Sequence, residues 1–491
     1  MASPRGSSAS LTALPVELML NISSNFTSAK DLDALARTCR GFYHHLNPLL
    51  YQRNIDQGQS SAVLWACEHG SIGTLERLHE QGADFGFLAK RPAHCGQTTV
   101  FAPIHVAAKH GHVDIVWWLL DHGAKLDALS QGYCDCPAFF PRLIRDPVQR
   151  AALPLTPLWS PLHTAVCYGN TEVAILFLER GASLIVSQRE EDVHPRWLTS
   201  RRDYLVADVT VMHTAAAANN VAVIDFIVDR KLAGLSCVDT AGYSPLHYAA
   251  TNAHTVGVLT RLLQMTDAWL PGPASPFSLA LQHGAFACAL TLLKAGHAPD
   301  DHDISVRTNL LHHAATRFPP LTWDSTFPVW LHQRDTFVRH LLAHNHPLTA
   351  RAAWYNQTPL HAFASLPSAQ TGPALFAALL AAGADPNALN AAGDTPLTIL
   401  ARSLNETSLP GQVEDASHAA AVAAIAETFS LFLDHGAKVC SFTAEALLVA
   451  DRLAATPWRK GLAKDILARA VKENADLRAA AAVGAGGIVS F

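Results

Sequence analysis

The sequence predicts an all-α protein in which a short three-helix domain precedes an α-solenoid of paired helices with inserted loops. Three observations carry this prediction. The first fifty-odd residues hold three short amphipathic patterns with helix-start signals, and from residue 60 onward a module of two apolar segments recurs. The chain also has 491 residues, more than one closed core normally holds.

The first helix is expected to begin at Pro15, because proline fits the first turn of a helix, where its missing N–H has no intrahelical acceptor anyway. Glu17 favours the positive end of the helix dipole. Leu18, Ile22 and Phe26 follow at intervals of four, which predicts one apolar stripe along this helix.

A second helix is expected around Asp31, since a carboxylate is favoured in a first turn. Gly41 interrupts this run, and a third apolar cluster surrounds Pro48. The apolar residues of these two segments are Leu32, Leu35, Ala36 and Cys39, then Phe42, Leu46, Leu49, Leu50 and Tyr51. Three short helices bury too little surface to be robust alone, so a partner or a neighbouring domain should complete their core.

At these positions the chain resembles the F-box. The matching residues are Leu14, Pro15, Glu17, Leu18, Ile22, Asp31, Leu32, Leu35, Cys39, Arg40, Phe42, Leu50 and Tyr51. Phe26 departs from the pattern, where leucine is commoner. The resemblance implies that residues 11–56 dock onto the Skp-type adaptor of a cullin-RING ubiquitin ligase, with contacts from Leu14, Pro15, Leu18, Ile22, Leu32, Leu35 and Leu50. The alternative is a three-helix cap that only seals the array.

The recurring module opens with Thr or Ser, Pro, Leu and His. Its clearest openings are residues 102–105, 160–163, 244–247 and 358–361, with weaker ones at 211–213, 275–278, 310–312 and 395–398. The hydroxyl caps a helix and proline fits its first turn. A mid-module Gly or Asn and a closing Gly are expected to end the two helices in left-handed conformation. Four modules share one interval between these glycines: Gly70 to Gly82, Gly111 to Gly123, Gly169 to Gly181 and Gly284 to Gly296.

By these residues the chain resembles ankyrin repeats, about nine of them over residues 60–440. The family is a generic protein-binding scaffold, so the resemblance implies the fold rather than a particular target. It also explains a set of histidines in one slot of the repeat, which hydrogen-bond along the stack in the family: His105, His163, His213, His247, His312 and His361. Residues 441–491 are expected to form a closing helical cap and a low-complexity tail.

Insertions near residues 85–97, 129–155, 188–208, 318–333 and 403–419 are expected to leave the array as loops. They are rich in Pro, Arg and aromatic residues, and solenoid insertions often lie on the binding side. We therefore expect target contacts from Trp117, Phe139, Phe140 and Trp197. For Trp117 and its neighbour Trp118, packing under the chain's own loop is the alternative, because both flank the apolar stripe of their helix.

Composition excludes several classes of protein. Charged residues make up 16% of the chain and the net charge is -5, which disfavours binding to nucleic acid or to an anionic membrane through a basic surface. The Ser-rich residues 1–10 are expected to be disordered and do not form a signal peptide. Nine cysteines within mostly apolar patterns indicate reduced thiols, hence a cytosolic or nuclear protein.

No catalytic residues, cofactor or metal are expected. The chain has no phosphate-binding Gly-rich loop and no Gly-x-Ser-x-Gly elbow. The conceivable zinc ligands are Cys134 and Cys136 with His94 and Cys95 from the preceding insertion. They lack Cys-x-x-Cys spacing and would have to converge from two loops, so unpaired thiols are expected there.

These observations predict a non-catalytic, substrate-recruiting subunit of an SCF-type ubiquitin ligase, with a Skp-type adaptor, a cullin and an unknown target protein as partners. A plain ankyrin scaffold is the second hypothesis, and a zinc-dependent or catalytic protein is the third. The order of F-box and degenerate ankyrin array also resembles proteins common in filamentous fungi.

Overall fold

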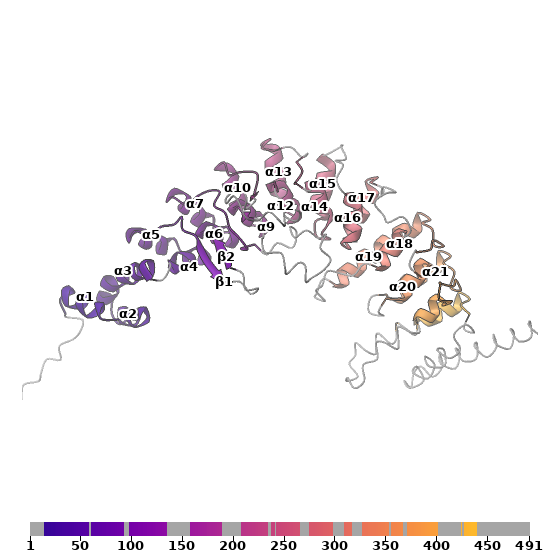
Figure 1. Ribbon diagram of the computed structural model, residues 1–491, viewed down its shortest axis with the longest axis horizontal. Coiled ribbons are helices and arrows are strands. Elements are labelled where there is room, and N and C mark those ends of the chain that lie inside the picture. Colours follow the sequence, from indigo (N-terminus) through magenta and orange to yellow (C-terminus); the bar gives the residue numbers. More distant parts are fainter. Residues whose placement is uncertain are drawn as a thin grey trace, which may run out of the picture. The chain divides into compact units, whose positions relative to one another are not determined.

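A computed structural model describes residues 14–57, 60–92, 98–134, 158–188, 208–233, 237–240, 242–265, 274–297, 309–316, 327–352, 355–366, 371–400, 424 and 427–438 (Figure 1). The chain divides into two compact units. The first comprises Met1–Ala249 with Arg261–Pro273, and the second comprises Ala250–Thr260 with Ala274–Phe491. Residues 1–10, 403–419 and 441–491, for which the sequence predicts a disordered start, a loop and a closing cap, lie outside the described residues.

The chain begins with the three expected helices, α1 (Val16–Ser24), α2 (Ala29–Ala36) and α3 (Arg40–Gln57), and both α1 and α2 pack against α3. Side-chain atoms accept backbone N–H groups at the N-terminal ends of α2 and α3. The Ser28 hydroxyl accepts a hydrogen bond from the Lys30 N–H, and the Cys39 sulfur accepts one from the Phe42 N–H at 3.4 Å. A small core holds the helices together: Met19, Leu32, Ala36, Phe42 and Leu46.

The third helix is longer than the sequence predicts. Gly41 does not interrupt it, and Pro48 lies inside it. Proline removes one hydrogen bond from a helix interior and usually bends or breaks it. Here the helix keeps Phe42 and Leu46 fully in the core, and this tertiary packing outweighs the local cost.

The first unit continues as helix pairs arranged in two rows (Figure 1). The first helices of the pairs pack on one another, and so do the second helices. The pairs are α4 (Ser61–His69) with α5 (Ile72–Glu80), α6 (Pro103–His110) with α7 (Val113–Asp121), α9 (Pro161–Cys167) with α10 (Thr171–Glu179), and α12 (Val211–Ala217) with α13 (Val221–Asp229). Helices α14 (Pro245–Ala250) and α15 (Val256–Met265) follow, and the boundary between the two units falls within both of them.

The second unit repeats this pattern, with α18 packed against α16 and α20, and α19 packed against α17 and α21. Its helices are α16 (Pro276–Gln282), α17 (Phe286–Lys294), α18 (Leu310–Thr316), α19 (Phe327–Ala343), α20 (Pro359–Ala364) and α21 (Pro373–Ala381), and residues 396–400 and 427–434 are also helical. The prediction of a loop over 318–333 is wrong at its end, because α19 already begins at Phe327. The indole N–H of Trp330 donates to the Gly284 carbonyl at 2.9 Å and anchors this early start.

Helix ends follow the sequence prediction. Gly70, Gly111 and Gly169 adopt φ of +69°, +76° and +78°, and Asn219 adopts +58° in the equivalent place. At the helix starts, the Ser160 and Ser275 hydroxyls each accept a backbone N–H from three residues further on. The described part of the chain is therefore the predicted all-α array of short, capped helix pairs.

Short strands join the helix pairs where the sequence predicts only loops. Strand β1 (Ala89–Pro92) pairs antiparallel with β2 (Thr98–Phe101), and β3 (Leu158–Trp159) pairs with β4 (Ser187–Gln188). Isolated bridges connect Val100 with Gln131 and Ser130 with Trp159. The ends of the insertions are thus tied to the neighbouring repeats by backbone hydrogen bonds.

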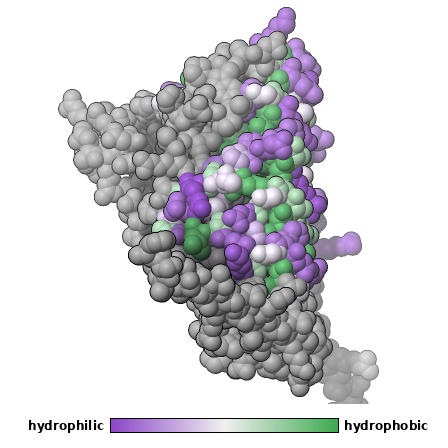
Figure 2. All heavy atoms as spheres, turned by 90° about the vertical axis from the view of Figure 1, so that its right-hand side faces the viewer, coloured by the Kyte–Doolittle hydropathy of each residue, from purple (hydrophilic) through white to green (hydrophobic). Residues whose placement is uncertain are grey.

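On the face drawn in Figure 2, hydrophobic and hydrophilic side chains are interspersed. Among the described residues, no helix is both long enough and apolar enough to cross a membrane.

Candidate protein-binding surfaces

Helix α1 contacts the rest of its domain through a narrow edge. Met19 and Ser23 face inward and are 7% and 1% exposed. Because successive residues of a helix are about 100° apart, Leu18 and Ile22 fall on one side of that edge and Leu20 on the other. Their exposed fractions are 50%, 43% and 38%.

Helix α3 adds two exposed apolar side chains, Tyr43 at 42% and Leu49 at 36% exposed. We refer to Leu18, Leu20, Ile22, Tyr43 and Leu49 as the N-terminal apolar set. Single exposed apolar residues are common on proteins, but five on the two helices α1 and α3 indicate a domain whose apolar side chains another molecule covers.

The seven residues predicted to contact an adaptor divide into three groups. Pro15, Leu18 and Ile22 are exposed. Leu14, Leu35 and Leu50 are half-buried against the internal core, and Leu32 is 1% exposed within it. The predicted single stripe of Leu18, Ile22 and Phe26 is not one face, since Phe26 follows the end of α1 and packs against the core.

Sequence reasoning missed Leu20, Tyr43 and Leu49 as exposed positions. Leu49 was assigned to the third apolar cluster, whose Phe42 and Leu46 are indeed buried. Helical phase does not separate Leu49 from this cluster, because Leu49 lies seven residues after Phe42, about 20° away around the helix axis at 100° per residue.

The N-terminal helices are also joined to the array, because α3 packs against both α4 and α5. The Asn54 side chain mediates the junction. Its carbonyl oxygen accepts the Ala62 N–H at 2.9 Å, and its amide donates to the Ser61 hydroxyl at 2.8 Å. The helices therefore cover the first repeat whether or not they bind a partner.

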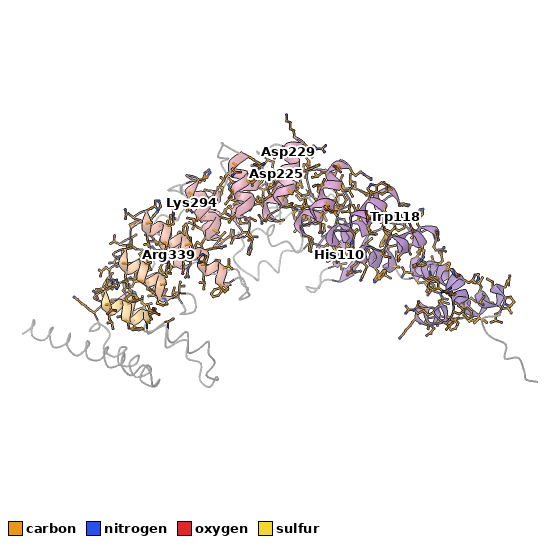
Figure 3. The ribbon with its side chains drawn as sticks, turned by 180° about the vertical axis from the view of Figure 1, so that it is seen from behind. His110, Trp118, Asp225, Asp229, Lys294 and Arg339 are labelled. Carbon is orange, nitrogen blue, oxygen red and sulfur yellow. The ribbon has the colours of Figure 1, made fainter. Side chains whose placement is uncertain are left out.

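Trp117 and Trp118 of α7 have different surroundings. Trp117 is 51% exposed, with the Arg180 guanidinium 5.3 Å from its ring, and Arg180 is paired with Asp121 at 3.2 Å. Trp118 (Figure 3) instead stacks on His122 and meets Phe85 edge-on, so it packs within the chain. The other predicted target contacts, Phe139, Phe140 and Trp197, lie outside the described residues.

The histidines of the module opening link one repeat to the next. In His105, His213 and His361, Nδ1 accepts the backbone N–H of the residue that precedes the helix, at 3.2 Å in each case. The Nε2–H donates to a carbonyl of the following repeat, at 3.2 Å to Trp159, 2.9 Å to Tyr243 and 3.1 Å to Asp394. One neutral tautomer satisfies both bonds.

Burial keeps these rings neutral. It lowers the pKa of His105 to about 4, and it also lowers the pKa of His213, His312 and His361. Such histidines are structural hydrogen-bonding groups, as the repeat pattern predicts.

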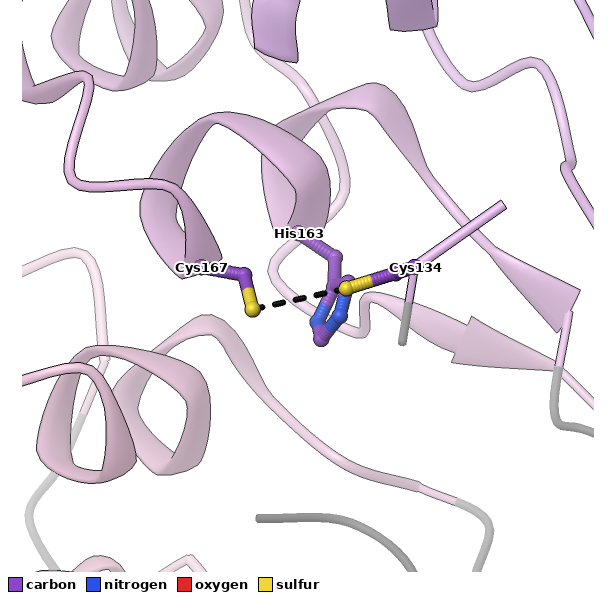
Figure 4. A group of neighbouring side chains, drawn as sticks. All are labelled: Cys134, His163 and Cys167. Atoms are coloured by element: carbon purple, nitrogen blue, oxygen red, sulfur yellow. Dashed lines mark hydrogen bonds between the residues drawn. The ribbon is translucent and has the colours of Figure 1, made fainter. Parts of the chain in front are cut away.

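His163 has a different environment, together with Cys134 and Cys167 (Figure 4). A ligand atom from each of the three side chains lies within 4.8 Å of the others, and the two sulfurs are 3.4 Å apart. This separation is well beyond the bond length of about 2.05 Å in a disulfide. Of the zinc ligands considered from sequence, Cys136, His94 and Cys95 lie outside the described residues.

Comparison with protein families agrees with this architecture. The model for F-box-like domains matches residues 11–55, the model for three copies of the ankyrin repeat matches residues 34–130, and a single ankyrin repeat matches residues 158–188. The chain thus carries an F-box-like domain followed by ankyrin repeats. Beyond residue 188, His213 and His361 make the same bonds as His105, and Asn219 and Gly284 adopt the same left-handed conformation as Gly111.

The chain is similar to two curated proteins over part of its length. It is 30% identical to ankyrin repeat domain-containing protein 49 of Bos taurus over 83 residues, which is 16% of this chain and 31% of that protein. It is 28% identical to Rabankyrin-5 of Mus musculus over 137 residues, 27% of this chain and 11% of that protein. The chain thus spans a third or less of either relative. F-box and ankyrin domains are modules that bind other proteins, and their presence supports a role for this chain in protein–protein interaction.

Proposed function

We propose that this protein is the substrate-recruiting subunit of an SCF-type cullin-RING ubiquitin ligase. Its F-box-like helices would bind a Skp-type adaptor, which in turn binds the cullin, and its ankyrin array would bind the target protein. Other subunits would transfer ubiquitin. This chain would contribute proximity, by raising the concentration of the target near the charged conjugating enzyme.

The N-terminal apolar set carries the proposal. Leu18 and Ile22 are each about half exposed on a helix whose inward edge already satisfies the domain core. Burying the exposed half of such a side chain is worth on the order of 1 kcal/mol. Leu18 and Ile22 share one side of α1 and supply an apolar contact of the kind that protein interfaces bury.

Target binding would use the array and its insertions. Trp117 is the described aromatic residue best suited to it, because it is exposed while Arg180 and Asp121 hold its surroundings in place. Phe139, Phe140 and Trp197 remain proposed contacts from the insertions. An assembly of this kind would act in the cytosol or the nucleus.

A scaffold whose F-box-like helices only cap the array is the second candidate. The packing of α3 on α4 and α5, with Asn54 at the junction, favours it. A capping role alone, however, does not explain why α1 exposes Leu18 and Ile22 to solvent. The two candidates differ in whether those residues bind an adaptor.

The test is calorimetric titration of a purified Skp-type adaptor with the full chain and with the double variant Leu18→Asp, Ile22→Asp. Because both side chains are exposed, the variant should fold, and its adaptor affinity should fall by at least about 100-fold. Leu389→Asp is the matched control, since Leu389 is 52% exposed in the second unit. Leu14→Ala is less suitable, because Leu14 packs against the core.

Equal adaptor affinity of the double variant and the wild type would contradict the proposed interface. Absence of adaptor binding by the wild type would favour the scaffold.

A further inference from the structure

The cluster of Cys134, His163 and Cys167 is outside the surfaces proposed above. His163 and Cys167 are four residues apart on α9, so they share one face of that helix. Cys134 comes from the segment that follows the Ser130–Trp159 bridge, in which each residue's N–H donates to the other's carbonyl at 2.9 Å. Backbone pairing thus fixes the segment that brings the second sulfur to α9.

The cluster is also enclosed by the protein. Cys134 is 3% exposed, His163 is 0% exposed, and Cys167 is half-buried. The His163 ring stacks on the Trp159 indole at 3.8 Å between centroids. Side chains of this kind, held by a helix and a paired backbone segment, form a pre-organised site.

His163 differs from the other histidines of its slot in its hydrogen bonds. In the neighbouring repeats Nδ1 accepts the N–H of the helix-capping residue, but the Ser160 N–H donates instead to the Val186 carbonyl. Nδ1 of His163 lies 3.1 Å from the Thr214 hydroxyl oxygen. Nδ1 of His163 therefore bonds to the next repeat, whereas Nδ1 of His105 and of His213 bonds to the start of its own helix.

We propose that Cys134, His163 and Cys167 bind a zinc ion that ties the segment after α7 to the first helix of the following repeat. Two thiolates and one imidazole are ligands that Zn²⁺ prefers. With Zn–S bonds of about 2.3 Å, tetrahedral coordination places two sulfurs about 3.8 Å apart, so their separation of 3.4 Å needs only a small adjustment.

Water or a further donor would take the fourth coordination position. Binding would release the thiol protons of both cysteines, and a ligating histidine commonly has its other ring nitrogen held by an oxygen. Thr214 supplies an oxygen on this ring. The role inferred for the ion is structural, because its ligands are enclosed and join two repeats.

The proposal is tested by metal analysis of the full chain, purified with zinc and without chelator, then dialysed to remove loosely bound ions. The wild type should retain about one zinc ion per chain. Cys134→Ser and Cys167→Ser should each lose most of it. Cys237→Ser is the matched control, because Cys237 is half-buried in the same unit and distant in sequence from the cluster, and it should retain zinc as the wild type does.

Cobalt substitution supplies a second readout that does not depend on a defective variant. Co²⁺ added to the metal-free wild type should produce a thiolate-to-cobalt charge-transfer absorption band, and zinc should displace it. The band should be reduced in Cys134→Ser, with circular dichroism verifying that the variant is folded. Wild-type protein without zinc, or serine variants with wild-type zinc content, would overturn the proposal. So would a disulfide between Cys134 and Cys167, found by peptide mapping of protein prepared without reductant.

Discussion

At the scale of single residues, buried neutral histidines join the repeats. His105 is 0% exposed, and burial lowers its pKa from the ordinary value of 6.5 to about 4. Both of its ring nitrogens are hydrogen-bonded, one within its own helix start and one to Trp159 of the next repeat. Protonation would replace the accepting nitrogen by a donor and break the first of these bonds.

This arrangement predicts that acid weakens the array. Between pH 6.5 and 4 the unfolded chain takes up a proton at His105 that the folded chain does not, so stability falls as the pH is lowered through that range. At pH 5 the loss from this residue is about 2 kcal/mol. Urea unfolding at pH 7 and pH 5 measures it, and His105→Gln should show a smaller difference between the two. An equal pH dependence in both proteins would contradict the account.

A second prediction concerns Gly111, which ends α6 with φ of +76°. A Cβ there would lie 2.7 Å from Oδ1 of Asn170, whose amide donates to the carbonyls of Ala108 and Lys109. Gly111→Ala should therefore combine left-handed strain of about 1 kcal/mol with the disturbance of two hydrogen bonds between repeats, about 2–3 kcal/mol in total.

The matched control is Gly169→Ala, where φ is +78° but, among the described residues beyond its two chain neighbours, no atom lies within 4 Å of the added Cβ. It should cost only the strain, about 1 kcal/mol. Urea unfolding compares the two variants, and equal losses would show that the contact with Asn170 is unimportant.

At this scale the sequence predicts local chemistry well and distant pairing poorly. Left-handed Gly111 follows from residue type and spacing, because it depends on a few neighbouring residues, and the role of the histidine slot follows from the resemblance to ankyrin repeats. The exposure of Leu18 and Ile22 does not follow, since an apolar stripe has the same pattern whether it faces a core or solvent. The approach of Cys134 to His163 depends on how an insertion folds back, which spacing does not encode.

At the scale of elements, the junction between α3 and α4 joins the two modules of the protein. The Asn54 side chain replaces backbone partners at the start of α4 by bonding the Ala62 N–H and the Ser61 hydroxyl. A helix start that loses such a bond loses about 1 kcal/mol. The junction should thus control how firmly the first repeat is ordered.

We expect Asn54→Ala to speed amide hydrogen exchange in α4 by roughly fivefold, which corresponds to that loss. Gln52→Ala is the control on the same helix, because the Gln52 amide donates to the exposed carboxylate of Asp56 at 3.2 Å and not to the start of α4. Mass spectrometry measures the amide hydrogen exchange of α4 in both variants. Unchanged exchange in Asn54→Ala would show that α3 is held by its apolar contacts alone.

Elements were predictable where their signals are periodic and local. Paired helices with Ser or Thr at the start and Gly or Asn at the end were predicted and are present in both units. The predictions failed where tertiary packing overrides local signals, at the unbroken α3 and at the early start of α19. The β1–β2 hairpin was missed because its strands are stabilised by pairing with each other and with Gln131.

At the scale of the whole molecule, the protein combines a helical domain that exposes an apolar surface with an array built for binding. The F-box-like and ankyrin matches cover residues 11–130 and 158–188. With 16% charged residues and a net charge of -5, recognition by a broad basic surface is disfavoured. Residues on the array and its insertions would then select the target, while the N-terminal apolar set would select the ligase.

The most direct measurement is affinity purification of the full chain from cells, beside the Leu18→Asp, Ile22→Asp variant and the Leu389→Asp control. The account predicts that the wild type and the control bring down a Skp-type adaptor and a cullin, and that the double variant loses both while keeping its target proteins. Adaptor recovered equally with all three chains, or with none of them, would contradict the account.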